Sequence, residues 1–297
     1  MSGRLFVLLA AILFSTGGAG IKAVDLSAWQ IAGFRSGIAF LSLLVLLPGS
    51  RRGWSLASAG VGLTYAGTLV CYALANRLTT AANTIFLQST APLYVLLLAP
   101  WLLGERLRRA DMVFGAVMAV GLMPFFLSSQ AASGTAPEPA AGNLLAAAAG
   151  VLWAVTVVGL RWLSRRKEAS RAGAAVAMGN LFACLACLPA ALPLEQPAAS
   201  DWLMLIYLGV VQIGVAYVFL TRGLERVPAF EASLLLLLEL VLNPLWAWWL
   251  HGERPGLWPL VGGGVIVSAT ALKSVWEGRR EGLRRASDLS SRNQVSR

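Results

Sequence analysis

Long apolar runs separated by short polar breaks form the dominant pattern along this chain of 297 residues. Each run holds 17 to 23 residues and carries few charges. A helix needs about 20 apolar residues to cross the hydrocarbon core of a bilayer, so each run predicts one transmembrane helix. The ten predicted helices are residues 5–21, 28–47, 56–76, 81–103, 112–128, 143–163, 173–192, 202–221, 230–250 and 257–275.

Two of the apolar segments are similar to each other. Residues 79–106 read TTAANTIFLQSTAPLYVLLLAPWLLGER, and residues 228–254 read PAFEASLLLLLELVLNPLWAWWLHGER. Both contain an internal proline and end in the letters GER, which indicates an internal duplication. The sequence therefore predicts four parts: a first five-helix repeat at residues 1–130, an extracytoplasmic linker at 131–142, a second five-helix repeat at 143–276 and a basic cytosolic tail at 277–297.

Composition places the chain in a membrane. Hydrophobic residues make up 57% of it and charged residues 13%, whereas a soluble domain of this length exposes far more charge. The net charge of +10 would suit nucleic acid, but the cations lie in short runs between apolar segments and in the tail, as topology determinants do. We therefore expect the lipid bilayer and a small-molecule substrate as partners, and no nucleic acid.

Known catalytic and nucleotide-binding motifs are missing from the sequence. It has no Walker motif, no nucleotide-binding glycine fingerprint, no HExxH metal motif and no nucleophile elbow. We therefore expect no cofactor, no metal site and no enzymatic activity, and transport that does not hydrolyse ATP on this chain.

The distribution of lysine and arginine predicts the orientation. With the N-terminus in the cytosol, 20 of the 24 Lys and Arg residues fall on the cytosolic side, and Arg35 lies inside a helix. The opposite side holds Lys22, Arg77 and Arg254. Because cytoplasmic loops carry an excess of Lys and Arg, we expect a multi-pass protein of the bacterial inner membrane with both termini in the cytoplasm.

This orientation inverts the two repeats relative to each other. The motif Gly104-Glu105-Arg106 falls in the cytosol and Gly252-Glu253-Arg254 falls outside, because each repeat has an odd number of helices. Inverted repeats are the architecture of secondary transporters, whose substrate site lies near the midplane where the halves meet. The predicted fold class is an all-α integral membrane protein with ten transmembrane helices in two inverted five-helix repeats.

Several short motifs follow one another in a known order. They are Leu13-Phe14-Ser15-Thr16-Gly17 with Ile21-Lys22, then Phe34-Arg35, then Ala91-Pro92 through Leu103-Gly104-Glu105-Arg106, then Leu238-Glu239 through Gly252-Glu253. As a set they resemble the drug/metabolite transporter superfamily, specifically its EamA-like families. The likeness covers almost the whole chain except the linker and the tail. It departs at Glu239-Leu240, where the family usually has Glu-Pro.

Two polar stripes mark the candidate substrate site. At 3.6 residues per turn, each of two predicted helices gathers its polar and aromatic residues on one face. The stripes are Tyr65, Tyr72 and Asn76 on the third helix, and Asn83, Thr90, Tyr94 and Trp101 on the fourth. They would suit a cavity that stacks on a ring and hydrogen-bonds a polar head group. The alternative is an interfacial aromatic belt with interhelical hydrogen bonds, which suits Trp101 best.

Few ionisable residues lie deep within the apolar runs: Arg35, Glu231 and Glu239, with Lys22 and His251 near helix ends. A charge at the bilayer centre costs at least about 2.5–3.5 kcal/mol, so each requires a partner or a watery cavity. Glu239, with Asn243 one turn further on, is either a proton carrier that couples transport or a structural hydrogen-bonding centre. Both readings stay open on the sequence.

Prolines interrupt both similar segments. Pro92 and Pro244 lack an amide proton, so each frees a carbonyl one turn earlier, at Gln88 and Leu240. We expect these points to kink their helices and to act as hinges. A static kink filled by neighbouring side chains is the alternative.

The predicted function is a secondary or facilitative transporter that exports small amphipathic metabolites, among them amino acids including aromatic ones, by alternating access. One alternative is a membrane-embedded enzyme acting on lipid or isoprenoid substrates, which should show carboxylates or histidines clustered at a membrane face. Another is a channel, which needs a continuous polar lining. The sequence leaves the exact substrate, the coupling ion and the oligomeric state open.

Overall fold

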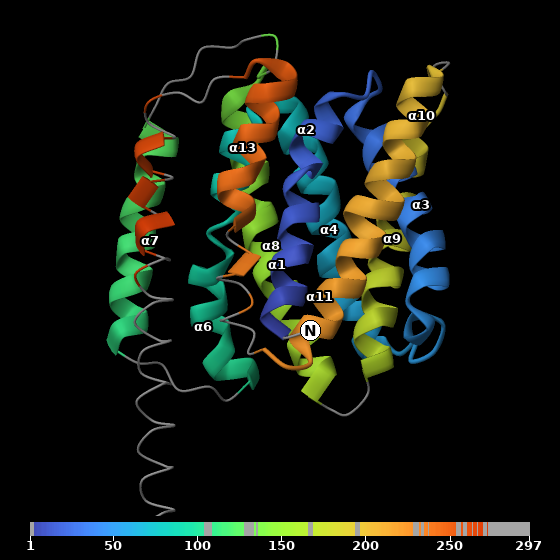
Figure 1. The fold of residues 1–297 in the computed structure, drawn as a ribbon, viewed down its shortest axis with the longest axis horizontal. Coiled ribbons are helices and arrows are strands. Elements are labelled where there is room, and N and C mark those ends of the chain that lie inside the picture. Colours follow the sequence, from blue (N-terminus) through green and yellow to red (C-terminus); the bar gives the residue numbers. More distant parts are fainter. Residues whose placement is uncertain are drawn as a thin grey trace, which may run out of the picture.

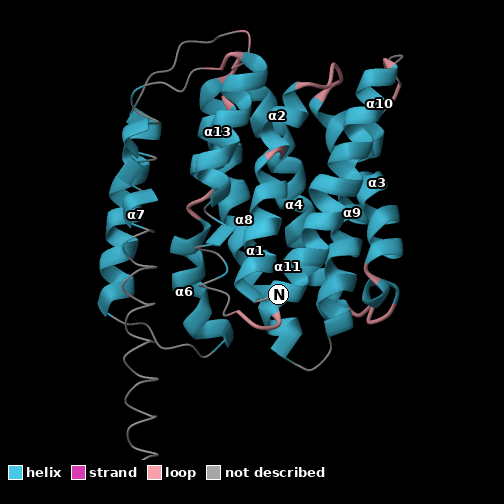
Figure 2. Ribbon diagram, viewed as in Figure 1, coloured by secondary structure: helices cyan, strands magenta, loops and turns pink. Residues whose placement is uncertain are grey.

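Helices standing side by side make up the bundle in a computed structural model of the chain (Figures 1 and 2). The structure describes residues 3–103, 109–127, 134, 136–165, 169–193, 197–227, 232, 235–236, 238–253, 257, 260–262, 264–265, 267–269 and 272. Several predictions lie outside these residues: the motif at Gly104-Glu105-Arg106, Glu231, Arg254, most of the tenth helix and the basic tail.

The predicted first half folds into seven α-helical segments and one short 3-10 turn. They are α1 (Gly3–Ser15), α2 (Gly17–Lys22), α3 (Ala28–Leu46), η1 (Pro48–Arg51), α4 (Leu56–Leu78), α5 (Ala81–Gln88), α6 (Ala91–Leu103) and α7 (Arg109–Leu127). The ends follow local capping chemistry. Ser27 and Gln30 form a reciprocal capping box at the start of α3, and Ser55 and Thr80 accept backbone N–H bonds at the starts of α4 and α5.

The predicted second half begins earlier than expected. Its described elements are α8 (Pro139–Arg165), α9 (Ala169–Ala191), α10 (Ala199–Ile206), η2 (Tyr207–Val215), α11 (Ala216–Leu224) and α13 (Leu238–His251). Residues 139–142, predicted as linker, already belong to α8, because Pro139 is well suited to the first turn of a helix.

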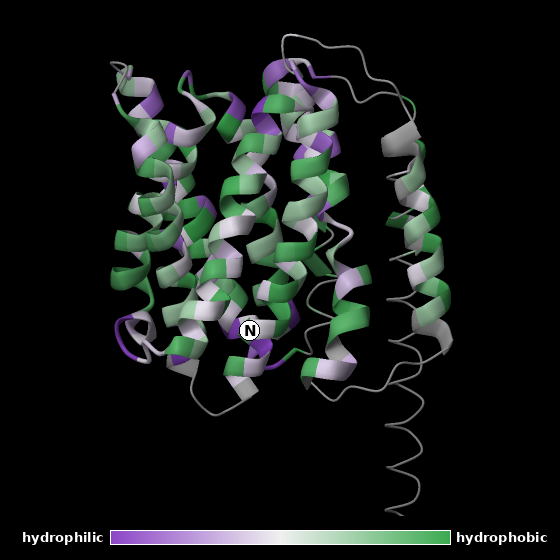
Figure 3. Cartoon of the chain, turned by 180° about the vertical axis from the view of Figure 1, so that it is seen from behind, coloured by the Kyte–Doolittle hydropathy of each residue, from purple (hydrophilic) through white to green (hydrophobic). Residues whose placement is uncertain are grey.

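Seven segments of the described chain are long and apolar enough to cross a bilayer. They are Gly3–Lys22, Ala28–Leu46, Leu56–Leu78, Ala81–Leu98, Pro139–Ser164, Arg171–Ala191 and Ala199–Leu224. Apolar residues dominate the middle of the bundle, and hydrophilic ones gather toward its two ends (Figure 3). Large apolar side chains such as Leu56 and Leu63 lie exposed, as expected for a surface that faces lipid. The prediction of an all-helical membrane protein is confirmed.

The first predicted helix forms one apolar span from Gly3 to Lys22, interrupted at a single turn residue, Thr16. α1 ends at Ser15 and α2 begins at Gly17. Side-chain hydroxyls take over part of the hydrogen bonding, since Ser15 Oγ donates to Ile12 O (2.6 Å) and Thr16 Oγ1 donates to Leu13 O (2.8 Å). Residues from the second half secure the break: Tyr207 OH donates to Thr16 Oγ1 (3.0 Å) and Trp246 Nε1 donates to Ser15 Oγ (3.0 Å).

The fourth predicted helix is also broken. α5 ends at Gln88 and α6 begins at Ala91, so the interruption falls at Ser89 and Thr90, just before Pro92. The missing amide proton of Pro92 explains the position. Thr90 satisfies Leu87 O with both its N–H (3.3 Å) and its hydroxyl (2.8 Å). Pro244, in contrast, lies inside the continuous helix α13.

The eighth predicted helix contains a π-helical segment, η2, between α10 and α11. Glycines let α3 approach this segment closely. A Cβ atom on Gly209 would lie 2.6 Å from Ile38 Cγ2, and one on Gly214 would lie 2.6 Å from Ser42 Oγ. π-Helical turns inside α-helices often mark functional sites, and η2 carries Gln212 toward the centre of the bundle.

Candidate functional site

A cavity lies among the middle turns of the bundle, between helices from both halves of the chain. Aromatic rings form much of its wall: Phe14, Tyr65, Tyr72, Trp153 and Tyr217. The rings of Tyr65 and Tyr217 have centroids 5.0 Å apart, and Phe14 packs edge-on against Tyr217 at 5.1 Å. Such pairs hold each other in fixed orientations, so the wall is a rigid aromatic surface.

The cavity is small in this conformation. It leaves about 50 Å³ for the centres of water-sized molecules. One such centre needs roughly 10–15 Å³, so the space holds a few waters.

Two opposite charges face this cavity without neutralising each other. Arg35 is 1% exposed and donates from Nη2 to Leu69 O (3.3 Å), while its Nε has no partner among the described residues. Glu239 on α13 lines the same cavity and an adjoining pocket beside Pro92. No salt bridge joins Arg35 to Glu239, although both lie in the described part of the chain. A buried charge needs a partner, so this pair offers positions for a ligand of mixed charge.

Two glutamine side chains line the cavity with oxygen atoms that accept no hydrogen bond from the described residues. Gln212 Nε2 donates to Phe14 O (3.4 Å), a carbonyl beside the break between α1 and α2. The Oε1 atoms of Gln212 and Gln88 are buried and, within the described residues, lack a hydrogen-bond partner. Buried unpaired acceptors are rare in folded proteins, and these two line the cavity, where a ligand or water could donate to them.

Tyr72 lines the cavity and is hydrogen-bonded to two asparagines that lie toward the Lys22 end of the bundle. Asn243 Nδ2 donates to Tyr72 OH (3.0 Å), and Asn76 Nδ2 donates to the Tyr72 carbonyl (3.0 Å). A Cβ atom on Gly18 would lie 2.5 Å from Asn243 Oδ1 and 3.1 Å from Asn76 Oδ1. The backbone of α2 therefore passes directly against this amide pair, and a side chain at position 18 would have to displace Asn243.

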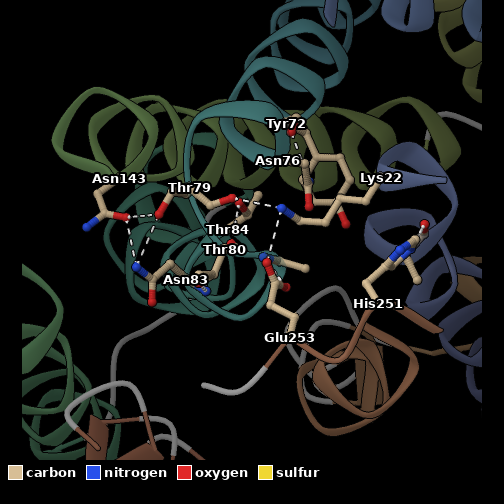
Figure 4. A network of polar contacts seen from close by, with 12 residues as sticks. Lys22, Tyr72, Asn76, Thr79, Thr80, Asn83, Thr84, Asn143, His251 and Glu253 are labelled. Carbon is tan, nitrogen blue, oxygen red and sulfur yellow. Dashed lines mark hydrogen bonds and ion pairs between the residues drawn. The ribbon is translucent and has the colours of Figure 1, made fainter. Parts of the chain in front are cut away.

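A second polar group closes one end of the bundle. We call it the end cluster, and it consists of Lys22, Thr79, Asn83, Asn143 and Glu253 (Figure 4). Lys22 Nζ lies 3.1 Å from Glu253 Oε1 and donates to Thr79 O at 3.2 Å. Thr79 Oγ1 donates to Asn143 Oδ1 (2.9 Å), and Asn83 Nδ2 donates to both of these oxygens (3.2 Å each). These contacts tie α2, α5, α8 and the segment that follows α13 together.

Comparison with known protein families identifies relatives of this chain. The sequence profile described as the EamA-like transporter family matches residues 1–127 and residues 140–275, which is most of the chain. The chain belongs to the EamA-like transporter family. The resemblance to the drug/metabolite transporter superfamily is thereby confirmed.

Two relatives of this EamA-like transporter are named exporters. The aromatic amino acid exporter YddG of Ancylobacter novellus is 33% identical over 221 residues, which cover 74% of this chain and 70% of that protein. The pseudopaline exporter CntI of Pseudomonas aeruginosa is 31% identical over 288 residues, covering 90% of this chain and 94% of that protein. A solved crystal structure aligns with a TM-score of 0.67 at 25% identity, over 94% of this chain and 98% of the other. Both named relatives are transport proteins rather than enzymes.

The EamA-like transporter gathers only part of the predicted site residues at the cavity. Tyr65 and Tyr72 line it, and so do Arg35 and Glu239, while Asn243 contacts it through Tyr72. Asn76 continues the same face of α4 but lines a different pocket, nearer Lys22.

The predicted stripe on the fourth helix does not reach the cavity. Asn83 belongs to the end cluster, and Thr90 Oγ1 packs close to Gly150 of α8. Tyr94 packs against the apolar cluster that α6 forms with α8. Trp101 is 87% exposed on the outer surface, where the aromatic-belt alternative placed it. The break at Ser89 and Thr90 makes spacing along one continuous helix a poor guide to these positions.

Sequence reasoning missed the second-half wall of the cavity and the ion pair of the end cluster. Gln212 and Tyr217 lie on the eighth predicted helix, which is the counterpart of the third in a two-fold duplication. The stripe of Tyr65 and Tyr72 on the third helix was a signal to search its counterpart. Lys22 and Glu253 both belong to quoted motifs, but nothing in the sequence indicates that they meet.

Proposed function

We propose that this EamA-like transporter is a secondary or facilitative exporter of small amphipathic metabolites, in particular amino acids including aromatic ones. One observation carries the proposal: the central cavity combines Arg35, Glu239 and an aromatic wall. A free amino acid has a carboxylate, an ammonium group and a side chain. Arginine suits the carboxylate, a carboxylate side chain suits the ammonium, and the rings suit an aromatic side chain.

The named relatives support this proposal. The YddG protein of Ancylobacter novellus is named as an aromatic amino acid exporter, and the CntI protein of Pseudomonas aeruginosa exports pseudopaline. The cavity residues Tyr65, Tyr72 and Tyr217 then contact the side chain of the substrate, and Gln88 and Gln212 contact its polar head. Asn83, Thr90, Tyr94 and Trp101 act in closure and packing rather than in binding.

We propose alternating access as the mechanism and ten transmembrane helices in two inverted repeats as its framework. The two matches of the family profile support the duplication. The small central cavity and the tied end cluster support a conformation closed at the Lys22 end. The breaks at Thr16 and at Ser89–Thr90 are the sites where helices can bend, and Pro92 and Pro244 act as the hinge prolines.

Counterflow in liposomes tests the function. The full chain is reconstituted with unlabelled L-phenylalanine inside, and the entry of labelled L-phenylalanine is followed. A carrier accelerates this exchange, whereas a channel shows no acceleration and an enzyme yields a chemically altered product. Absence of exchange for aromatic and aliphatic amino acids alike contradicts the proposal.

The role of Glu239 in coupling has its own test. If Glu239 carries a proton, an imposed pH gradient accelerates export by the wild-type protein, and Glu239→Gln removes that acceleration because an amide does not exchange a proton. If export by the wild-type protein ignores the gradient, transport is facilitative and Glu239 serves only to bind the ammonium group.

Orientation is tested by labelling. We propose that both termini lie in the cytoplasm and that the exposed Glu138 lies outside. In a chain whose native cysteines are replaced by alanine, Glu138→Cys should react with a membrane-impermeant maleimide in intact cells. Reaction only after the membrane is opened contradicts the inverted-repeat orientation.

A further inference from the structure

We infer that Lys22 and Arg77 form a second substrate site, at the end of the bundle, and that Glu253 pairs with Lys22 in place of the substrate's carboxylate until the substrate displaces it. The inference rests on the proposed function in one respect, that the substrate carries a carboxylate. By the proposed orientation, this site lies on the side where an exported substrate leaves.

The site is a pocket distinct from the central cavity. Lys22, Asn76, Arg77 and His251 line it, and we call it the end pocket. It leaves about 210 Å³ for the centres of water-sized molecules, against about 50 Å³ in the central cavity. The end pocket therefore already has room for the head group of a small metabolite.

Lys22 is paired with an anion in this conformation. Its side chain is 7% exposed, and that of Glu253 is 4% exposed. A buried ammonium group left without an anion is strongly destabilised, so Glu253 departs readily only when another anion takes its place. A substrate carboxylate is such an anion, and Arg77 beside it adds a second positive charge to the pocket.

Glu253 itself shows how a carboxylate is held here. One oxygen pairs with Lys22 Nζ (3.1 Å), and the other accepts from the backbone N–H of Ala81 (3.0 Å) in the first turn of α5. One carboxylate thus joins the end of α2, the start of α5 and the segment that follows α13. Replacement of Glu253 by a substrate carboxylate would release α13 while keeping Lys22 and α5 satisfied, which couples substrate departure to opening of this end.

Asn76 provides the place for the ammonium group of the substrate. It is fully buried, it lines the end pocket, and within the described chain its Oδ1 has no hydrogen-bond partner. It lies one helical turn beyond Tyr72, which lines the central cavity. The two sites are therefore neighbours along α4, and a substrate moving from one to the other passes the amide pair of Asn76 and Asn243.

Binding of three related probes tests the inference on the purified full chain. The probes are L-phenylalanine, 3-phenylpropanoate, which lacks the ammonium group, and 2-phenylethylamine, which lacks the carboxylate. Lys22→Gln should weaken binding of both carboxylate probes by about tenfold or more and leave 2-phenylethylamine unchanged. Glu253→Gln should act in the opposite direction and tighten both carboxylate probes several-fold, because the internal competitor is gone.

The opposite signs separate this inference from a purely structural ion pair. A structural pair predicts that the two substitutions act in the same direction on all three probes, and that result overturns the inference. So does the absence of carboxylate binding in both the wild-type protein and Glu253→Gln. If Lys22→Gln does not fold, the double variant Lys22→Gln/Glu253→Gln, which leaves no unpaired charge, is compared with Glu253→Gln. Equal carboxylate affinity in these two also overturns the inference.

The outcome is distinguishable from failure of the proposed function. If L-phenylalanine shows counterflow but its binding does not depend on Lys22, the proposed export function is supported and the second site is contradicted. If binding of 3-phenylpropanoate depends on Lys22 but no amino acid shows counterflow, the second site is supported and the proposed export of amino acids is contradicted.

Discussion

The central cavity and the end cluster each contain a basic and an acidic side chain, but within the part of the chain that the structure describes only those of the end cluster form an ion pair. In the cavity, Arg35 and Glu239 face the same space without pairing. In the end cluster, Lys22 and Glu253 pair at 3.1 Å. A charged side chain inside a membrane protein needs a partner of opposite charge. Two side chains that do not pair with each other can both bind a ligand, whereas two that do pair hold their helices together. We propose that the same chemistry serves binding at the centre and closure at the end.

The largest expected effect comes from removing the unpaired carboxylate of the cavity. Glu239→Gln should lower L-phenylalanine exchange by about tenfold or more, because a hydrogen bond to a charged group contributes about 1.5–3 kcal/mol. The amide keeps the shape of the side chain, so the yield of folded protein should stay close to that of the wild type. Initial rates of counterflow in liposomes measure the effect. Unchanged rates would show that Glu239 does not bind the substrate, and the proposed difference between the central cavity and the end cluster would be wrong.

The next effect concerns the glycine beneath the amide pair. Gly18→Ala places a Cβ atom 2.5 Å from Asn243 Oδ1, which is too close for a normal contact, and such overpacking costs roughly 1–3 kcal/mol. Thermal unfolding in detergent measures the loss.

Gly60→Ala is the matched control for this substitution. Gly60 lies within α4, and the space where its Cβ would go is open. Alanine in a helix is favoured over glycine by about 0.5–1 kcal/mol, so this variant should be neutral or more stable. Equal destabilisation by both substitutions would show that the contact at Gly18 is unimportant.

A smaller loss is expected at the turn that positions Glu253. Gly252 has φ of +64°, and its N–H donates to Trp248 O (2.9 Å) as α13 ends. Gly252→Ala should cost about 1–2 kcal/mol because an L-residue is strained in this conformation. Gly252→Asn should cost less, since asparagine tolerates it. Unfolding temperatures that rank alanine above asparagine would contradict this account of the turn.

The smallest effect is expected on the aromatic wall. Tyr65→Ala should weaken L-phenylalanine binding several-fold, because an aromatic contact contributes about 0.5–1.5 kcal/mol beyond the buried area. Trp101→Ala is the matched control, an aromatic truncation on the exposed outer surface, and should leave binding unchanged. A larger loss from Trp101→Ala than from Tyr65→Ala would move the binding surface away from the central cavity.

The sequence was most informative where a single helix carries the signal. Apolar run length predicted α3, α4 and α9 within a few residues, because bilayer thickness fixes that length. The stripe of Tyr65 and Tyr72 pointed to the cavity for the same reason, since α4 is continuous.

Prediction failed where the helix changes its period. The break at Ser89–Thr90 separates the predicted stripe into parts that face different neighbours, so Asn83 and Tyr94 do not share a surface. The π-helical turns of η2 change the spacing around Gln212. The meeting of Lys22 with Glu253 depends on helix packing across 231 positions of sequence, which periodicity does not describe.

The glycines of α2 have a consequence for how the selectivity of this protein can diverge. A Cβ atom on Gly17 would meet Gln212 at 2.8 Å, and one on Gly20 would meet Leu208 at 2.7 Å. A side chain at either position would have to displace Gln212, which lines the cavity, or Leu208 of η2. We therefore expect a change of substrate to come more readily from substitutions in α4, η2 and α13, which carry Tyr65, Gln212 and Glu239, than from the glycines of α2.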